Sequence, residues 1–463
     1  MARMFMRGDV GVVVSVLCTH TMPFPILLRT PCLFAFPVAR VCVCSVLRMY
    51  RRIKSDGRYK SRVVACGNRQ ARDELDLYSP TPRLSTVRVL LHQAVNNNWA
   101  ADVSDVSVAF LNSRLPKPIY CHLPAGRQKP GERKQVMRCQ KALYGISPYV
   151  CHYHDAHHML ARAPAVPGAR EAPRMWHDLL HNWFVAGGFD VNPHDCCLYT
   201  RWQDGQPLHC LVHVDDVLMV GPQSQVDAFK ADLSKSFAVT GGDPIKMYLG
   251  MEFTRNDAGF TVSQEYIIEK LLVRAGKHVS NASKAKVPMR CVRLDKSTSP
   301  VTEDEKLKWK EYPFRSYLGA IGYVMLGTAP HLAHAYGQLS RFNDSYGKQH
   351  WDALIELLAY VRNHYKTDKM HISRGAGNNL VAYCDADWNA SYDSKSTIGW
   401  IVFLGSTPVS WCSRLQKSTA LSTAQAEYVS LASVGQELAY LQSLMHSIRT
   451  PSTPASDFIT GRL

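Results

Sequence analysis

The amino-acid sequence predicts an α+β fold divided into two or three domains, and two observations support this prediction. The chain has 463 residues, of which 46% are apolar and 20% are charged, so it is long and apolar enough to bury a substantial core. From residue 48 onward, strand-like and helix-like stretches alternate, with turn-forming residues between them. No internal repeat is evident.

The charge balance points to a polyanionic partner. Lysine and arginine total 54 against 38 acidic residues, which gives a formal net charge of +16. Each neutralised phosphate releases condensed counterions, so nucleic acid is the first partner to expect. The 14 cysteines are scattered without a C-x-x-C pair, which favours reduced thiols in an intracellular protein, in the cytoplasm or the nucleus.

Residues 1–47 have an atypical apolar composition. Prolines and arginines interrupt them, including Pro23, Arg29 and Pro31. A transmembrane helix needs about 20 uninterrupted apolar residues, and a signal peptide needs a basic start and a small-residue cleavage site. We therefore expect a leader outside the fold and no membrane partner, with a targeting or membrane element as the alternative.

The elements that follow are predicted from turn signals and hydrophobic periodicity. A basic hairpin opens this region, because Asp56-Gly57 is a turn signal and the next residues alternate as a strand. The remaining predictions are a helix over 86–95, a strand over 105–112, a β-hairpin over 208–220, a helix over 264–275, strands over 380–383 and 397–403, and a helix over 424–445.

The predicted hairpin over residues 208–220 contains two adjacent aspartates, Asp215 and Asp216, between apolar β-formers. Burying two carboxylates is costly unless a cation compensates them. Mg²⁺ does so, since it prefers oxygen ligands and keeps coordination positions open for phosphate. The alternative is an ordinary solvent-exposed Asp-Asp turn.

Asp105 opens another apolar stretch upstream. With Asp215 and Asp216 it would supply three carboxylates from two strands. Two-metal phosphoryl transfer requires such a set, with one ion activating the attacking oxygen and the other neutralising the leaving group. The three aspartates are therefore the candidate catalytic residues.

Residues 147–169 differ from both neighbouring segments. They contain a Cys/His tract at 151–158, followed by Pro164 and Pro167. Cysteine and histidine are zinc ligands, but structural zinc sites usually show paired ligands separated by a loop. We favour a solvated insertion or an unspliced intron over a metal site.

Six motifs follow one another along the chain: YKSRVVACG at 59–67, YSP at 78–80, DVSVAFLN at 105–112, KALYG at 141–145, HVDD at 213–216 and YLGME at 248–252. In this order they resemble the reverse transcriptase of copia-type retrotransposons, and the resemblance covers most of residues 48–448.

This resemblance implies a right-hand polymerase with fingers, palm and thumb, in which Asp105, Asp215 and Asp216 hold Mg²⁺ or Mn²⁺. Phe110 matches the aromatic steric gate that excludes a 2′ hydroxyl. The resemblance further implies that Lys60 and Arg62 grip the incoming triphosphate, while Tyr144 and Gly145 line the nascent base pair. The implied partners are an RNA template, a DNA primer, an RNA/DNA hybrid and deoxynucleoside triphosphates, and a homodimer stays open.

A second resemblance lies downstream, where AYCDADW at 382–388 and LSTAQAEY at 421–428 are similar to the opening strand and first helix of the family's ribonuclease H domain. Asp385 and Glu427 carry over as metal ligands, while Asp387 is ambiguous. The family's two further aspartates have no counterpart here, so an incomplete domain with little or no hydrolysis is expected.

Three departures from the family pattern bear on activity. The insertion at 147–169 interrupts the helix expected after KALYG, His213 replaces a tyrosine beside the aspartate pair, and Cys66 replaces a lysine. A partly protonated His213 would repel magnesium. The runner-up hypothesis is therefore an inactive relic that retains nucleic-acid binding, and a metal-dependent phosphatase or nuclease is a third possibility.

The resemblance also sets the expected domain order. It is a leader over 1–47, the polymerase over 48–300, a connection region over 301–375 and an incomplete ribonuclease H-like α/β domain over 376–463.

Overall fold

The structure is a computed structural model, and it describes residues 17–18, 43–53, 59–65, 79–107, 109–122, 136–141, 172–280, 285–290, 294–388 and 395–449. Statements about structure concern this part of the chain. Its residues divide into two compact units. The first contains the described residues up to 81 and those between 106 and 187, and the second contains 82–105 and the described residues from 188 onward.

The first unit contains a sheet with the strand order β1-β3-β2-β5-β6. The strands are β1 (Leu17–Cys18), β2 (Val43–Ile53), β3 (Tyr59–Ala65), β5 (Arg114–His122) and β6 (Val136–Lys141). β2 pairs antiparallel with β3 and parallel with β5. The unit also contains the 3₁₀ helix η3 (Ala109–Asn112) and helix α2 (Ala172–Ala186). α2 buries Trp176, Leu180 and Phe184 at helical spacing.

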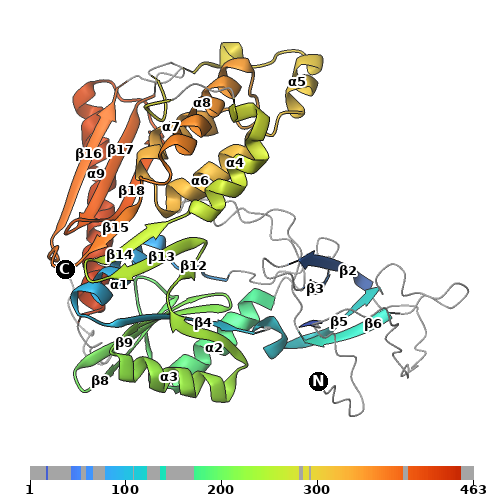
Figure 1. The fold of residues 1–463 in the computed structure, drawn as a ribbon, viewed down its shortest axis with the longest axis vertical. Coiled ribbons are helices and arrows are strands. Elements are labelled where there is room, and N and C mark those ends of the chain that lie inside the picture. Colours follow the sequence, from blue (N-terminus) through green and yellow to red (C-terminus); the bar gives the residue numbers. More distant parts are fainter. Residues whose placement is uncertain are drawn as a thin grey trace, which may run out of the picture. The chain divides into compact units, whose positions relative to one another are not determined.

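The second unit begins with a sheet in the order β11-β4-β10-β9-β8-β7. Figure 1 labels its strands β4, β8 and β9. Its strands are β4 (Ala100–Val106), β7 (Asp190–Val191), β8 (Leu198–Gln203), β9 (Gln206–His213), β10 (Asp216–Gly221) and β11 (Val239–Pro244). Helices α1 (Leu84–Asn96) and α3 (Gln223–Ser236) contact β10. Leu218 and Val220 of β10 share a core with α1, and strand alternation turns Val217 and Met219 to the opposite face.

The next part combines a four-stranded sheet with a group of helices. The sheet order is β12 (Met247–Tyr248), β13 (Met251–Asn256), β14 (Gly259–Ser263) and β15 (Met370–Ser373). The helices are α4 (Glu265–Ser280), η4 (Lys296–Thr298), α5 (Glu303–Lys310), α6 (Phe314–Gly327), η5 (Pro330–Leu332), α7 (Ala333–Ser340) and α8 (Lys348–His364). α4, α6, α7 and α8 bury a core of their own, with Leu271, Leu318, Leu339 and Leu354 in it.

The C-terminal part is a three-stranded antiparallel sheet of β16 (Leu380–Asp387), β17 (Thr397–Leu404) and β18 (Thr407–Leu415). The long helix α9 (Thr423–Ser447) packs on this sheet. Trp400, Val402 and Leu404 of β17 are buried in the same core as Leu441 of α9, so α9 covers the face that carries the even-numbered residues.

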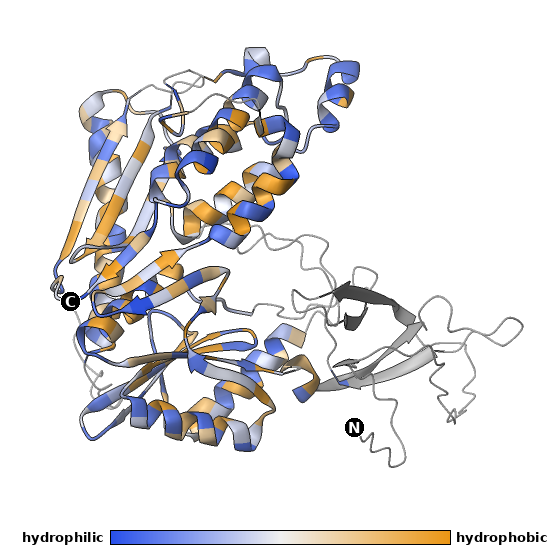
Figure 2. Cartoon of the chain, viewed as in Figure 1, coloured by the Kyte–Doolittle hydropathy of each residue, from blue (hydrophilic) through white to orange (hydrophobic). Residues whose placement is uncertain are grey.

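One hydrophobic core runs through most of the second unit. It contains Leu90 of α1, Leu218 of β10, Phe260 of β14, Val402 of β17 and Leu441 of α9. Figure 2 shows apolar residues along β16 and β17 and along the helices α4, α6 and α8. The sheet that bears β10 and the C-terminal sheet are therefore parts of one folded body.

Arg88 of α1 also holds these parts together. Its guanidinium donates hydrogen bonds to the carbonyl oxygens of Val409 (3.0 Å), Gly327 (2.8 Å) and Leu326. It also lies 4.0 Å from the centre of the Trp411 ring. Burial lowers the pKa of Arg88 to about 9, so the group keeps its charge at neutral pH.

The predicted helices and strands are largely confirmed. α1, the β9–β10 hairpin, β16, β17 and α9 contain the expected segments, and α4 begins at Glu265, one residue after the predicted start. The predicted strand over 105–112 is wrong, because β4 ends at Val106 and residues 109–112 form η3. Ser113 N–H donates to the Phe110 carbonyl at 3.1 Å, and such local bonding competes with a strand ladder.

Some predictions fall outside the described residues. Most of the expected leader and the whole insertion at 147–169 lie there. β2 begins at Val43, so residues 43–47, assigned above to the leader, belong to this strand. No helix among the described residues is long and apolar enough to cross a membrane.

Candidate active site

The β9–β10 hairpin positions the two adjacent aspartates. Its strands are apolar and buried, which leaves the turn at the end of the sheet. His213 pairs with Asp216, so Val214 and Asp215 are the two turn residues. Val214 has a φ of 59°, a left-handed conformation that is strained for a β-branched residue. The hairpin therefore holds Asp215 on a strained turn.

β4 brings Asp105 to the same place. β4 pairs antiparallel with β10, and Asp105 lies directly opposite Asp216. Residues directly opposite each other in such a pair have Cβ atoms about 4.5–5.5 Å apart. Leu218 lies opposite Val103 in the same register, and a slip of one residue would turn Leu218 out of the core. The burial of Leu218 thus fixes the register that places Asp105 opposite Asp216.

The electrostatics of Asp216 reflect this proximity. Burial, and then the negative charges of Asp215 and Asp105, raise the pKa of Asp216 to about 7. Asp215 and Asp216 are half-buried and Asp105 is exposed. The Asp216 carboxylate is therefore close enough to Asp215 and to Asp105 to be repelled by both.

His213, which replaces the family's tyrosine, lies beside the pair. Burial lowers the pKa of His213, and the charge of Asp215 opposes this shift without reversing it. The imidazole is therefore neutral at physiological pH. The expected repulsion between His213 and a metal ion therefore does not arise, because it requires a protonated imidazole.

The three acids fit a divalent cation by their chemistry. Carboxylate oxygens are the ligands that Mg²⁺ and Mn²⁺ prefer, and such an ion would offset both the burial of Asp216 and the neighbouring charges of Asp215 and Asp105, which together raise its pKa. In the described part of the chain, however, no group of three or more His, Cys, Asp or Glu side chains already forms a cluster that could hold a metal ion. The pairing of β4 with β10 brings the backbones of the acidic residues together, but their side chains do not already form a metal-binding site.

A buried ion pair supports β4 from its other face. Asp102 is 2% exposed and accepts a hydrogen bond from the Lys230 ammonium of α3. Asp102 lies opposite Met219, on the strand face turned away from α1. Removing one partner of such a pair leaves an uncompensated buried charge, so Lys230 secures the strand that carries Asp105.

The structure gives less information on the predicted substrate-binding residues. Lys60 and Arg62 lie on β3, with their backbones paired to Arg52 and Tyr50 of β2. Phe110 lies in η3 and is 7% exposed. Tyr144 and Gly145 lie outside the described residues. The roles of these five residues stay predictions.

Comparison with known protein families identifies the class. The profile of the family described as reverse transcriptase (RNA-dependent DNA polymerase) matches residues 44–164 and 157–291. These segments include β4 and the β9–β10 hairpin. The chain belongs to this reverse transcriptase family.

Curated relatives support the copia-type assignment. The retrovirus-related Pol polyprotein from transposon TNT 1-94 of Nicotiana tabacum is 30% identical over 410 residues, which cover 86% of this chain and 29% of that protein. The Pol polyprotein from transposon RE2 of Arabidopsis thaliana is 30% identical over 404 residues, with coverages of 85% and 25%. The predicted copia-type resemblance is confirmed, and the chain spans less than a third of the length of these relatives.

The residues of the second predicted acidic site come from β16 and α9. Glu427 Oε1 of α9 accepts a hydrogen bond from the backbone N–H of Ala386 at 3.3 Å, one residue beyond Asp385. Asp385 and Asp387 project from the strand face turned away from α9. There they line a pocket of about 550 Å³ together with His334. Glu427 thus contacts the backbone next to Asp385, but the Asp385 side chain lies on the other face of β16, and the two do not join a metal-binding cluster within the described residues.

The YLGME motif has structural roles that the sequence analysis missed. Leu249 and Gly250 form its turn with φ values of 48° and 65°. A side chain at Gly250 would meet the Tyr323 hydroxyl at 2.5 Å. That hydroxyl donates to the Leu249 carbonyl at 2.6 Å. The motif's glycine therefore allows the turn to contact α6.

Glu252 of the same motif caps α4. Its carboxylate accepts hydrogen bonds from the Ser263 hydroxyl at 2.9 Å and from the N–H groups of Glu265 at 3.1 Å and Tyr266 at 3.2 Å. A negative group at a helix N-terminus satisfies donors that have no partner in the helix and interacts favourably with the helix dipole. The sequence shows that residue 252 is acidic, but its separation from α4 along the chain gives no sign that it caps this helix.

Proposed function

We propose that the chain is the polymerase region of a retrotransposon Pol polyprotein and that it copies RNA into DNA by nucleotidyl transfer. Asp105, Asp215 and Asp216 are its catalytic carboxylates. The observation that carries the proposal is the strand register that sets Asp105 opposite Asp216, next to Asp215 on the turn. Two-metal transfer to a 3′ hydroxyl needs carboxylates from adjacent strands, and the family match supports this class of reaction.

The same carboxylates would hold Mg²⁺, or Mn²⁺ in its place. When bound, the metal supplies Lewis-acid stabilisation of the phosphoryl oxygens and lowers the pKa of the attacking hydroxyl. Asp216, with its pKa raised to about 7, carries a proton in part of the population at neutral pH and releases it when it becomes a ligand. The strained turn at Val214 holds Asp215 at the end of the hairpin.

The substrates in this proposal are an RNA template, a DNA primer and deoxynucleoside triphosphates. Lys60 and Arg62 contact the triphosphate, and Phe110 excludes a 2′ hydroxyl. Tyr144 and Gly145 line the nascent base pair. The formal net charge of +16 supports a polyanionic partner.

The proposed domains are a right-hand polymerase over 48–300, a connection region over 301–375 and a ribonuclease H-like domain over 376–463. Asp385 and Glu427 would bind metal in the last of these. Asp385 and Glu427 alone would support at most weak cleavage of an RNA/DNA hybrid. The proposed setting is intracellular, cytoplasmic or nuclear, and a homodimer is compatible with it.

Primer extension on an RNA template with Mg²⁺ tests the polymerase proposal. Asp215→Asn should lower incorporation more than about a hundredfold, because an amide replaces a charged ligand oxygen at the reacting phosphate. Asp204→Asn is the matched control. Asp204 lies on the β8–β9 turn of the same sheet with a φ of 51°, which asparagine tolerates, so activity should be retained. Equal incorporation by the wild type and Asp215→Asn would contradict the mechanism.

The second candidate is an inactive relic that still binds nucleic acid. The insertion at 147–169, which interrupts the helix expected after KALYG, favours it. A wild-type chain that binds a template–primer but incorporates nothing would identify this case. The family match, which spans the polymerase motifs, argues against a phosphatase or nuclease.

A further inference from the structure

A cavity of about 550 Å³ lies between the C-terminal sheet and the short helices η5 and α7, all within the second unit. Its sheet wall is the face that α9 does not cover. Tyr383, Ile401 and Trp411 line this wall and lie directly opposite one another on the three strands. Pro330 and Ala333 form part of the other wall. Small-molecule sites have volumes of about 300–1,000 Å³ and mostly apolar walls, so the cavity has the size and the lining of such a site.

Two glycines show why this space is open. A Cβ atom at Gly337 of α7 would lie 3.1 Å from the Ser413 carbonyl oxygen, so α7 approaches β18 closely. At Gly399 of β17, which lines the cavity, no atom of the described residues lies within 4 Å of such a Cβ atom. Tyr383 of β16 is 64% exposed. The helix therefore touches the sheet at β18 and leaves the sheet face open over β16 and β17.

Two carboxylates line the cavity on its β16 side. Asp385 and Asp387 are exposed, and they project from the same strand face with Cα atoms about 6–7 Å apart. His331 and His334 line the opposite side. Partial burial lowers the pKa of both imidazoles, so they are neutral at physiological pH. The ionised groups that line the cavity are therefore acidic.

The guanidinium of Arg341 lies near this cavity. It donates a hydrogen bond to the Thr397 hydroxyl at 3.1 Å. After burial, its charge is the next cause that lowers the pKa of His334, and the charge of Asp387 opposes it. One cation thus faces two carboxylates, and the balance of charge favours a cationic occupant.

We propose that this cavity binds a small aliphatic diamine, with its two ammonium groups at Asp385 and Asp387 and its methylene chain against the apolar sheet face. The spacing of the two acids along β16 matches the two ammonium groups of a short diamine such as putrescine. Charge-assisted hydrogen bonds to carboxylates are among the strong ones, and an ammonium group also gains from a nearby aromatic ring such as that of Tyr383. This site goes beyond the polymerase proposal and does not depend on it.

Isothermal titration calorimetry of putrescine into the full chain, freed of nucleic acid, tests the proposal. We expect saturable binding at one site. Butylamine has the same carbon chain but a single ammonium group, so it should bind at least about tenfold more weakly. Absence of putrescine binding to the wild type, or equal affinity for the two amines, would overturn the proposal.

Two variants locate the binding site. Gly399→Phe places a ring in the open space of the cavity, and a strand position accepts an aromatic residue. Asp387→Asn removes one of the two charges. Each should weaken putrescine binding at least about tenfold, and melting curves verify that each variant folds. Asp304→Asn is the matched control, because Asp304 is exposed on α5 and does not line the cavity. Equal losses for Asp387→Asn and Asp304→Asn would mean a general attraction to acidic groups and would refute the site.

Magnesium chloride is the competing probe, because Asp385 is also a proposed metal ligand. A metal ion gains nothing from the apolar walls, whereas the methylene chain of putrescine does. We therefore expect putrescine to stay bound when magnesium is added at the same concentration. Displacement of putrescine by an equal concentration of magnesium would show that the carboxylates alone account for binding, and the diamine site would be wrong.

Discussion

Val214 shows how a single residue stores strain beside the proposed catalytic pair. A β-branched residue with a φ of 59° carries a cost of about 1–2 kcal/mol, because its Cβ approaches the following carbonyl. Asparagine tolerates this region far better. We expect Val214→Asn to raise the free energy of unfolding by about 1 kcal/mol in urea denaturation. Val214→Ile, which keeps the β-branch, should give no gain, and a gain of equal size would refute this explanation.

His209 gives the fold a defined sensitivity to acid. It is fully buried in β9, and burial lowers its pKa to about 4, while its Nδ1 lies 2.9 Å from the Thr200 hydroxyl. The unfolded chain takes up this proton below about pH 6.5, whereas the folded chain does so near pH 4. Its contribution to stability should therefore be complete above pH 6.5 and fall by about 1.4 kcal/mol per pH unit between pH 6.5 and 4.

Denaturation at several pH values measures this effect. His209→Gln cannot ionise, so the stability of that variant should fall less steeply across the same pH interval. Parallel curves for the wild type and His209→Gln would show that another group controls the acid limb.

The sequence located the acids at the residue scale but not their environment. Asp105, Asp215 and Asp216 were evident from their apolar flanks. The raised pKa of Asp216 depends on burial and on pairing across strands that are distant in sequence. The strain at Val214 depends on a two-residue turn that requires the exact hairpin register.

At the scale of elements, helix α4 depends on a distant cap. Glu252→Ala would leave the Ser263 hydroxyl and the N–H groups of Glu265 and Tyr266 without their acceptor. We expect a loss of about 1–2 kcal/mol in the free energy of unfolding and faster hydrogen exchange in the first turn of α4. Glu252→Gln keeps one acceptor oxygen and should lose less. Equal stability of the alanine variant and the wild type would show that water replaces the cap.

Other caps were within reach of sequence reasoning because their partners are local. Thr302 and Glu305 form a capping box at α5, and Ser422 accepts from the Gln425 N–H at α9. Both follow the rule that a residue before the helix pairs with the third residue inside it. Glu252 breaks that pattern because β14 lies between it and α4. The error over residues 105–112 is similar, since a short 3₁₀ turn replaced a strand that hydrophobicity alone favoured.

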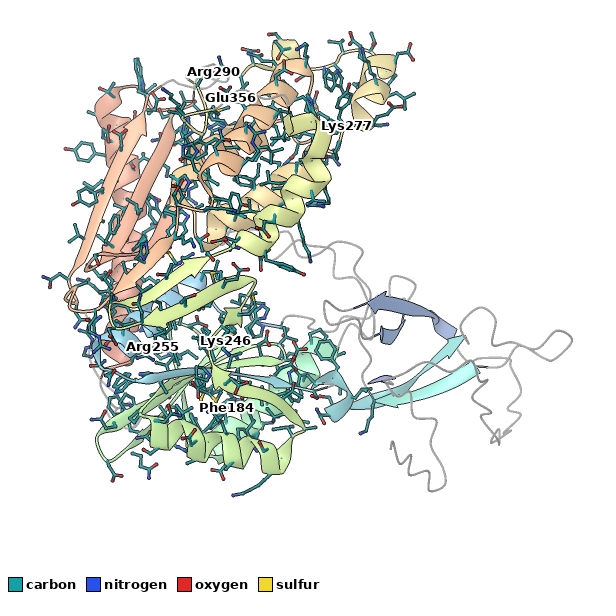
Figure 3. All side chains as sticks on the ribbon, viewed as in Figure 1. Phe184, Lys246, Arg255, Lys277, Arg290 and Glu356 are labelled. Carbon is teal, nitrogen blue, oxygen red and sulfur yellow. The ribbon has the colours of Figure 1, made fainter. Side chains whose placement is uncertain are left out.

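At the scale of the whole second unit, Arg88 joins three parts of the chain. Arg88→Met should cost about 2–4 kcal/mol of unfolding free energy, because buried carbonyl groups of Val409 and Gly327 lose a charged donor. Arg290→Met is the matched control. Figure 3 labels Arg290 beside Glu356, with which it forms an ion pair, and the Arg290 side chain is 70% exposed. Its loss should change stability by less than about 0.5 kcal/mol.

Chemical denaturation of both variants measures how much Arg88 contributes to stability. A loss for Arg88→Met no larger than that for Arg290→Met would mean that the Arg88 hydrogen bonds do not contribute to holding α1, α6 and β18 together. The proposed boundary between polymerase and ribonuclease H-like regions does not coincide with a break in that core, since Leu218 and Val402 belong to the same cluster.

The sequence by itself determined the class of fold, most elements, the order of the motifs and the identity of the acidic residues. Local turn residues and hydrophobic periodicity carry that information. Only the tertiary structure decided that Asp105 lies opposite Asp216, that Glu252 caps α4 and that Arg88 reaches β18. Each of these contacts joins residues that are separated in sequence, and their strand register and distance are set by the packing of the whole core.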